Sequence, residues 1–155
     1  SAVTSGSILF EGIDLSSISP KKFQKVRGND IAMVFQEPMS SLNPSMSCGK
    51  QVLEIILQHT SLSKSKAKKE VISLFEKVKL PSPEITYNKY PHEISGGQKQ
   101  RVMIAMAIAC KPKVLIADEP TTALDVTVQK DIIGLLKSLQ TEHNMSIISD
   151  IICIL

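Results

Sequence analysis

The sequence predicts an α/β fold built on parallel strands. Short apolar runs of strand length alternate with segments of helical periodicity, which is typical of a parallel sheet covered by helices. This alternation is interrupted from about Cys48 to Cys110 by a stretch that is helical throughout. The chain has 155 residues, and 43% of them are hydrophobic. That length suits one compact domain with its own core and is too short for two ordinary domains.

The first half of the chain is expected to hold three strands and three helices. Two apolar segments flanked by glycines favour a strand–turn–strand unit over residues 6–15. Pro20 suits the first position of a helix, and Pro81 and Pro83 end the last of the three helices. The other expected elements are a helix over Pro20–Val26, a strand over Ile31–Phe35, a loop over Ser40–Ser47, and helices over Gly49–His59 and Ser65–Lys79.

The second half is expected to continue the alternation. Ser95 is placed to cap a helix that runs to Cys110. Val114–Ala117 is an apolar strand that ends abruptly in acidic residues. Asp125 is placed to cap a further helix, because apolar residues recur on one face after it. Met145–Ile148 then forms a last strand.

The formal net charge of +3 is concentrated in one segment. Residues 61–80 hold six lysines and two glutamates. Apolar residues recur among them at helical spacing, so the lysines are expected on the solvated face of an amphipathic helix. A local run of lysines could instead bind nucleic acid or an anionic lipid. The absence of an arginine cluster and of interleaved aromatic residues favours the solvated helix face.

Composition also argues against a membrane-spanning or secreted protein. The longest uninterrupted apolar run is Val102–Cys110, whereas a spanning helix needs about 18 apolar residues or more. The first six residues have neither a basic flank nor an apolar stretch, so no secretory signal is expected there. The three cysteines lie far apart without CxxC spacing. They fit reduced thiols in a cytosolic protein and give no metal site.

The strongest chemical feature is the pair Asp118-Glu119, directly after the strand Val114–Ala117. Adjacent carboxylates are costly to desolvate, so packing alone does not account for them at the end of a buried strand. The carboxyl ends of parallel strands face the crevice in which α/β sheets bind ligands. One carboxylate can hold Mg²⁺ while the next polarises an attacking water. A helix cap or a salt-bridged turn is the alternative interpretation.

Two weaker features accompany this pair. The segment Ser95–Gln98 opens a helix with two glycines, which lets backbone N–H groups and the helix dipole approach an anion. A plain N-cap explains that segment equally well when it is taken alone. Gln36 directly follows the strand Ile31–Phe35, and a neutral amide at that place can coordinate a metal or position water.

Taken in order, these features resemble the ATPase of ABC transporters. After Gln36 come a helical stretch and the segments SGGQKQR at 95–101, LIADEP at 115–120 and ALD at 123–125. They look like the Q-loop, the signature motif, Walker B with its catalytic glutamate, and the D-loop. The resemblance runs from about Gly6 to about Ile148. It implies that residues 1–155 form a partial P-loop NTPase sheet with an inserted helical subdomain over 48–110.

Three longer segments narrow the resemblance to the ATPase subunits of oligopeptide and dipeptide importers, a group that includes nickel importers. They are FQEPMSSLNP at 35–44, YPHEISGG at 90–97 and ADEPTTALDVTVQ at 117–129. Met39–Pro44 could be an ordinary surface turn. Its place beside Gln36 instead favours a loop next to the docking surface for the membrane subunit.

The resemblance implies a head-to-tail dimer in which two ATPase domains enclose two ATP molecules. In such a dimer Asp118 would hold Mg²⁺ through water. Gln36 would contact both Mg²⁺ and the attacking water, and Glu119 would be the general base.

The remaining implied roles concern the partners. Asp125 would cross the dimer interface. The helical subdomain would rotate and push on the membrane permease, which implies a cytoplasmic protein, peripheral on the inner face of the cell membrane. The γ-phosphate of ATP held by the other subunit would be bound by Ser95, Gly96, Gly97 and Gln98.

The sequence departs from the family pattern at both ends. It contains no GxxxxGKS or GxxxxGKT segment, the loop that cradles the phosphates of ATP. The family places that loop upstream of the segment at 6–12. Residues 149–151 read Ser-Asp-Ile, and the switch histidine that the family has after the strand in this region is absent from them. We therefore expect a fragment of an ATP-hydrolysing importer subunit that is itself inactive.

Two other classes of function stay open at this point. One is a soluble ABC ATPase of translation, which carries two such cassettes in one chain. Repair members instead insert a long coiled coil between the Gln and Ser-Gly-Gly motifs, whereas prolines break the corresponding stretch here. The other class is a non-catalytic interaction module, which the absent phosphate loop keeps in consideration.

Overall fold

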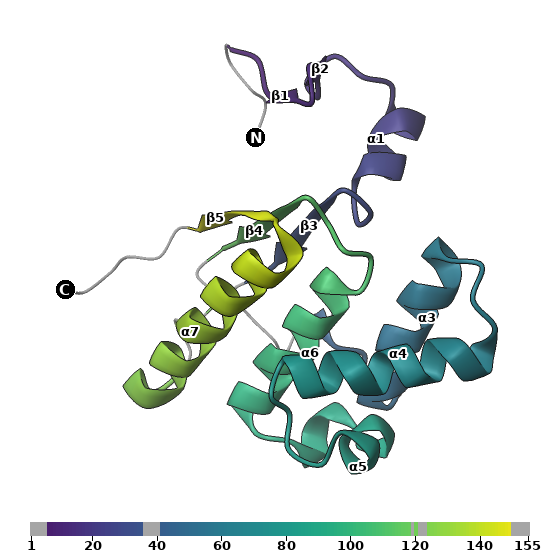
Figure 1. Ribbon diagram of the computed structural model, residues 1–155, viewed down its shortest axis with the longest axis vertical. Coiled ribbons are helices and arrows are strands. Elements are labelled where there is room, and N and C mark those ends of the chain that lie inside the picture. Colours follow the sequence, from purple (N-terminus) through teal and green to yellow (C-terminus); the bar gives the residue numbers. More distant parts are fainter. Residues whose placement is uncertain (1–5, 36–40, 119, 121–123, 150–155) are drawn as a thin grey trace.

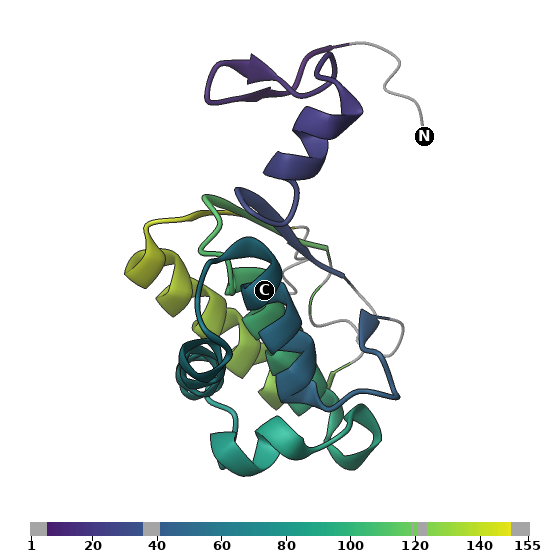
Figure 2. The ribbon, with the colours of Figure 1, turned by 90° about the vertical axis from the view of Figure 1, so that its right-hand side faces the viewer.

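The hairpin and the helix expected at the start of the chain are both present. Strands β1 (Leu9–Phe10) and β2 (Ile13–Asp14) pair antiparallel, and α1 (Pro20–Val26) follows them. The hairpin and α1 project away from the other elements (Figure 1; Figure 2). The computed structural model describes residues 6–35, 41–118, 120 and 124–149.

The central sheet has three parallel strands in the order β3-β4-β5, which confirms the expected fold class. They are β3 (Ile31–Val34), β4 (Val114–Ala117) and β5 (Ser146–Ser149). The bounds of β4 are those expected from the sequence. Strand β3 ends one residue earlier than expected, and β5 is shifted by one residue toward the C-terminus at both ends. Val34 lies opposite Ala117. The carboxyl ends of the strands therefore meet at one edge of the sheet.

The longer helices gather on one face of this sheet (Figure 1). No described helix is both long and apolar enough to cross a membrane. Helix α7 (Val126–His143) connects β4 to β5. Between β3 and β4 lie α3 (Cys48–His59), α4 (Lys64–Lys77), α5 (Pro83–Asn88), the short 3-10 helix η1 (Pro91–Glu93) and α6 (Gly96–Ile108).

Helix α5 was not expected from the sequence. The sequence pattern predicts only that Pro81 and Pro83 end the preceding helix. Pro83 instead occupies the first turn of α5. A backbone N–H in the first turn has no acceptor within the helix, so the N–H that proline lacks costs no helical hydrogen bond. Ser82 before it adopts a left-handed backbone with φ of 45°. The Thr86 hydroxyl donates a hydrogen bond to the Pro81 carbonyl at 2.7 Å, which holds the turn closed.

The core lies between the sheet and its helices. Along β3, Ala32 and Val34 are buried while Met33 between them is exposed, so one face of the sheet packs inward. Leu115 and Ala117 of β4 are fully buried on that inner face. The largest buried apolar side chains that α6 and α7 contribute to the core are Ile104, Ile108, Ile132, Leu135 and Leu139.

The opposite side of the sheet, here called the open face, carries apolar side chains that are exposed or only half-buried. The strand register places Met33, Ile116 and Ile148 in one row across the three strands. The side chain of Met33 is 40% exposed and that of Ile148 is 60% exposed. Contiguous apolar surface of this kind on a sheet favours association with another apolar surface.

We expect the 155-residue chain to self-associate in solution through the open face. Sedimentation velocity should show species larger than a monomer, and replacing both Met33 and Ile148 by lysine should shift them toward the monomer. Charged side chains break up a contiguous apolar surface patch and so oppose association through it. A monodisperse wild-type monomer with sharp, well-dispersed amide signals throughout would contradict this prediction.

Candidate functional site

The Ser95–Gln98 turn begins α6 and forms a capping box. The Ser95 Oγ accepts a hydrogen bond from the Gln98 backbone N–H at 3.3 Å, and the Gln98 Oε1 accepts one from the Ser95 N–H at 3.1 Å. These two bonds confirm the N-cap and fix the start of the helix. Ser95 and Gly96 are exposed. The positive end of the helix dipole is therefore accessible to an anion from solvent.

The two glycines of this turn face α7, a packing role that the sequence analysis did not predict. A Cβ at Gly97 would lie 2.9 Å from Cγ1 of Val128, closer than van der Waals contact allows. A Cβ at Gly96 would lie 3.6 Å from Cδ2 of Leu124, which is an ordinary contact. Gly97 thus lets α6 approach the first turn of α7 more closely than any side chain would permit.

Alanine at Gly97 is expected to destabilise the chain by about 1–2 kcal/mol, since overpacking forces neighbouring groups to move. Alanine at Gly96 is the matched control and should cost clearly less, because the position has room for a methyl group. Adding Val128→Ala to Gly97→Ala should recover part of the loss. Urea denaturation followed by circular dichroism measures the free energies of unfolding of the wild type, Gly97→Ala, Val128→Ala and the double variant, and additive costs would show that the contact carries no coupling.

Asp125 is the N-cap of α7, as the sequence predicted. Its Oδ1 accepts a hydrogen bond from the Val128 N–H at 3.0 Å. The Gln129 side chain also donates to the Leu124 carbonyl at 2.9 Å, which adds a second bond at the same helix end. Asp125 remains exposed. Val128 thus contacts both the residue that caps α7 and the glycine turn of α6.

Arg101 ties α6 to two other helices, although no role was assigned to it from the sequence. Its guanidinium donates a hydrogen bond to the Val78 carbonyl at 2.8 Å, at the end of α4. A second guanidinium nitrogen lies 3.9 Å from the Asp131 carboxylate of α7. The side chain is only 13% exposed. The sequence signal for this role is an arginine directly before the apolar run Val102–Cys110. Its partners could not be predicted, because they lie far from it in the sequence.

A second ion pair joins α4 to α7. Lys77 Nζ lies 2.6 Å from Glu142 Oε1, and the hydrogen bond from Lys77 lowers the pKa of Glu142 below its usual value. Together with the Arg101 contacts, this pair links α4 and α6, which lie between β3 and β4 in the chain, to α7. Arg101 thus holds α6 against the first half of α7, and Lys77 holds α4 against its last turn.

Asp118 follows β4 at the carboxyl edge of the sheet. Its backbone N–H donates to the Val34 carbonyl at 3.0 Å, which continues the pairing of β4 with β3 past the last strand residue. The residue is exposed. Within the described ranges, no hydrogen bond or ion pair joins its carboxylate to the Ser95–Gln98 turn. The described residues thus show no direct polar contact between these two predicted sites.

Gln36 and Glu119 lie outside the described residues, so their predicted roles stay predictions. Phe35 and Ser41, which flank the first of these gaps, both line an apolar groove of about 630 Å³. Helix α3 contributes Ile55 to this groove, and α6 contributes Met103 and Met106. An apolar groove thus lies beside the segment that was expected to adjoin a docking surface.

The sequence matches the family model described as ABC transporter over residues 1–122. It is 56% identical over 143 residues to the oligopeptide transport ATP-binding protein OppD of Bacillus subtilis (strain 168). It is 49% identical over 146 residues to the dipeptide transport ATP-binding protein DppD of the same strain. These matches cover 92% and 94% of this chain, and 40% and 44% of the two relatives. The chain therefore spans about two-fifths of the length of these curated relatives.

The fold is similar to solved ATP-binding cassettes. One is the cassette MJ0796 in a dimeric post-hydrolysis state bound to ADP and Pi, with a TM-score of 0.81, 28% identity, and coverage of 94% of this chain and 62% of that one. Another is cbiO1 of Clostridium perfringens, part of the transporter complex cbiONQ, with a TM-score of 0.80, 34% identity, and coverage of 94% and 55%. The family model, the sequence relatives and the parallel sheet with its helices show that this chain belongs to the ABC transporter family, as part of an ATP-binding cassette.

Proposed function

We propose that this chain is part of the ATP-hydrolysing subunit of an importer for oligopeptides, dipeptides or similar solutes. The observation that carries the proposal is the packing of Gly97 against Val128, which joins the Ser95–Gln98 turn to the Asp125 cap. These are the two elements that an ABC dimer interface requires. The names of the Bacillus relatives, oligopeptide and dipeptide transport ATP-binding proteins, support the solute class.

We assign the hydrolytic step to the carboxyl edge of the sheet. The exposed Asp118 carboxylate offers oxygen ligands, the type that Mg²⁺ prefers, and would hold the ion through water. Bound Mg²⁺ would neutralise charge on the ATP phosphates. Gln36 would orient the attacking water, and the Glu119 carboxylate would accept its proton. No group of three metal-ligating side chains forms among the described residues, so phosphate oxygens and water would complete the coordination.

The Ser95–Gln98 turn fits a phosphate that comes from a second ATPase subunit. Its Ser95 hydroxyl and the start of α6 are exposed, and Gly96 adds no side chain to obstruct an approaching anion. Asp118 and this turn make no direct polar contact within the described residues. Two half-sites that are completed by different subunits would account for that lack of contact. Asp125, at the end of the same packed unit, would then cross the interface.

We assign permease docking to the apolar groove between α3, α6 and β3. The groove is lined by Phe35 and Ser41, so the segment between them would sense the docked membrane subunit. Residues 48–110 would rotate as the helical subdomain, with the Arg101 and Lys77 contacts to α7 as its connections to the sheet. We therefore propose that the protein is cytoplasmic and lies peripherally on the inner face of the cell membrane.

Transport by a chimera tests the proposal. The matching segment of Bacillus subtilis OppD is replaced by this chain, and the chimera is expressed in a strain that lacks OppD. Uptake of a labelled tripeptide should be restored, and Asp118→Asn in the graft should reduce it about 100-fold or more. Lys21→Ala on α1 is the control and should leave uptake unchanged. A chimera that is expressed at the membrane but restores no uptake would contradict the proposal.

A further inference from the structure

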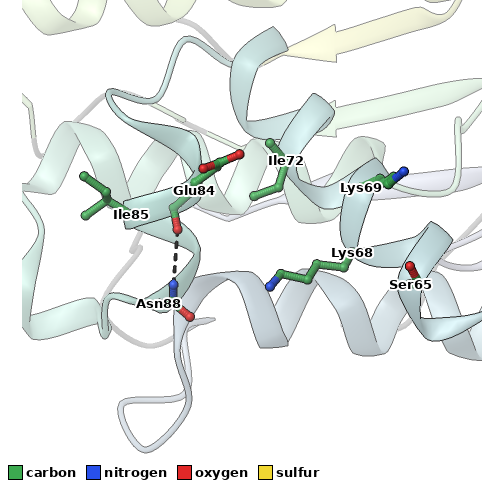
Figure 3. Close-up of a pocket in the computed structure, with 7 residues that line it drawn as sticks. All are labelled: Ser65, Lys68, Lys69, Ile72, Glu84, Ile85 and Asn88. Carbon is green, nitrogen blue, oxygen red and sulfur yellow. Dashed lines mark hydrogen bonds between the residues drawn. The ribbon is translucent and has the colours of Figure 1, made fainter.

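A separate cavity of about 680 Å³ lies between α4 and α5, away from every residue assigned above. Its volume is in the range of sites that hold a small ligand or a few peptide side chains. Helix α4 contributes Lys68, Lys69 and Ile72 to it, and α5 contributes Ile85 and Asn88. In Figure 3 the Lys68 side chain extends toward Asn88. Nothing in the proposed ATPase cycle uses this cavity.

The cavity combines a cationic wall with an apolar one. Lys68 Nζ lies 5.0 Å from the centre of the Tyr87 ring, a cation–π contact that keeps the ammonium at the rim. Ile85 on the opposite wall is 60% exposed, and Ile72 is half-buried. The Asn88 amide donates to the Glu84 carbonyl at 3.2 Å, which fixes its orientation beside them. The walls therefore suit a ligand with an apolar side chain next to a negative charge.

The charge on α4 is not explained by the stability of the helix. The amphipathic face is as expected, with Ala67 and Val71 buried, and the lysines at 64, 66, 68 and 69 are exposed. These lysines lie near the positive end of the helix dipole, where cations are unfavourable. Among the described residues none of the four pairs with a carboxylate. Lys66 also stands where a glutamate would complete a capping box with Ser63.

We propose that this cavity is a docking site for an acidic peptide segment of a partner protein. An apolar side chain of the segment packs on Ile72 and Ile85, and its carboxylates face Lys68 and Lys69. Glu84 on the α5 rim repels a second acidic group, so it sets the orientation of the segment. A flat anionic bilayer would meet Glu84 as well as the lysines and could not enter the hollow.

Fluorescence anisotropy of the 155-residue chain tests this inference without nucleotide, so its outcome is independent of the ATPase proposal. The probe is a fluorescein-labelled hexapeptide with acidic residues on one side only, Glu-Glu-Ile-Leu-Ser-Ser. We expect saturable binding that Lys68→Glu with Lys69→Glu weakens at least about tenfold, since two attractive charges become repulsive. Ile85→Ser should weaken it about fivefold by removing apolar contact. All three residues are exposed, so circular dichroism should show an unchanged fold.

The matched control is Lys21→Glu with Lys22→Glu on α1, which makes the same change in net charge at another exposed site. Its affinity should stay within about twofold of the wild type, because screening limits charge effects to about 10 Å at 0.1 M salt. Equal loss in both double variants, or no binding at all, would overturn the proposal. So would capture of phosphatidylglycerol vesicles through Lys68 and Lys69 when the peptide does not bind.

Discussion

Replacing Gly49 by alanine is expected to destabilise the chain by about 3 kcal/mol, the upper end of typical overpacking costs. A Cβ at this position would overlap ring atoms Cγ and Cδ2 of Tyr87 and lie 2.6 Å from Cε2. The backbone cannot easily withdraw, because the Cys48 N–H donates to the Lys89 carbonyl at 2.8 Å and ties α3 to the end of α5. Thermal unfolding should show a midpoint lower by roughly 6–12 °C.

The matched control for Gly49→Ala is Gly134→Ala on α7. Gly134 is exposed, and a Cβ there would meet no atom within 4 Å. Alanine should therefore stabilise the chain by about 0.5–1 kcal/mol through its helix propensity. We therefore predict that glycine-to-alanine substitution lowers the free energy of unfolding at position 49 and raises it at position 134. Equal effects of the two substitutions would show that α3 and α5 do not pack as described.

The reactivity of Cys48 gives an independent readout of the same contact. Burial raises the pKa of its thiol to about 11, so little thiolate exists at pH 8. Mass spectrometry after brief alkylation should find Cys48 unmodified in the wild type and modified in Gly49→Ala. If Cys48 stayed unmodified in a destabilised Gly49→Ala variant, the structural change would not lie at the contact between α3 and α5.

The 155-residue chain alone is expected to bind Mg-ATP very weakly and to hydrolyse none. Its sequence contains no Gly-rich loop with the Lys that would cradle the β- and γ-phosphates. Calorimetric titration should show no saturable heat in the micromolar range, and phosphate release should equal that of buffer. Low-micromolar affinity, or phosphate release that Glu119→Gln abolishes, would contradict this prediction.

Local sequence patterns predicted most of the helices and strands. The apolar run Val114–Ala117 is bounded by a proline turn and by Asp118, so its limits were clear. The caps Ser95 and Asp125 were identified because serine and aspartate side chains satisfy N–H groups at helix starts, and both make the expected bonds. The alternation of strands and helices then determined the parallel sheet.

Contacts between distant segments could not be predicted. The role of Gly97 depends on Val128, which belongs to another helix and follows β4. The partners of Arg101 are a carbonyl at the end of α4 and a carboxylate on α7. Neither pairing can be recognised from local composition or periodicity. Helix α5 was missed because proline can both end one helix and begin the next, and the sequence alone does not decide between the two.

Phosphate release by the purified OppD chimera tests the central claim most directly. The claim is that this chain supplies the hydrolytic carboxylates and the Ser95–Gln98 turn of an ABC ATPase. The chimera should hydrolyse Mg-ATP, and Glu119→Gln should lower the rate about 100-fold or more while ATP binding persists. A folded chimera that binds ATP but releases no phosphate, or one whose rate is unchanged by Glu119→Gln, would contradict the claim.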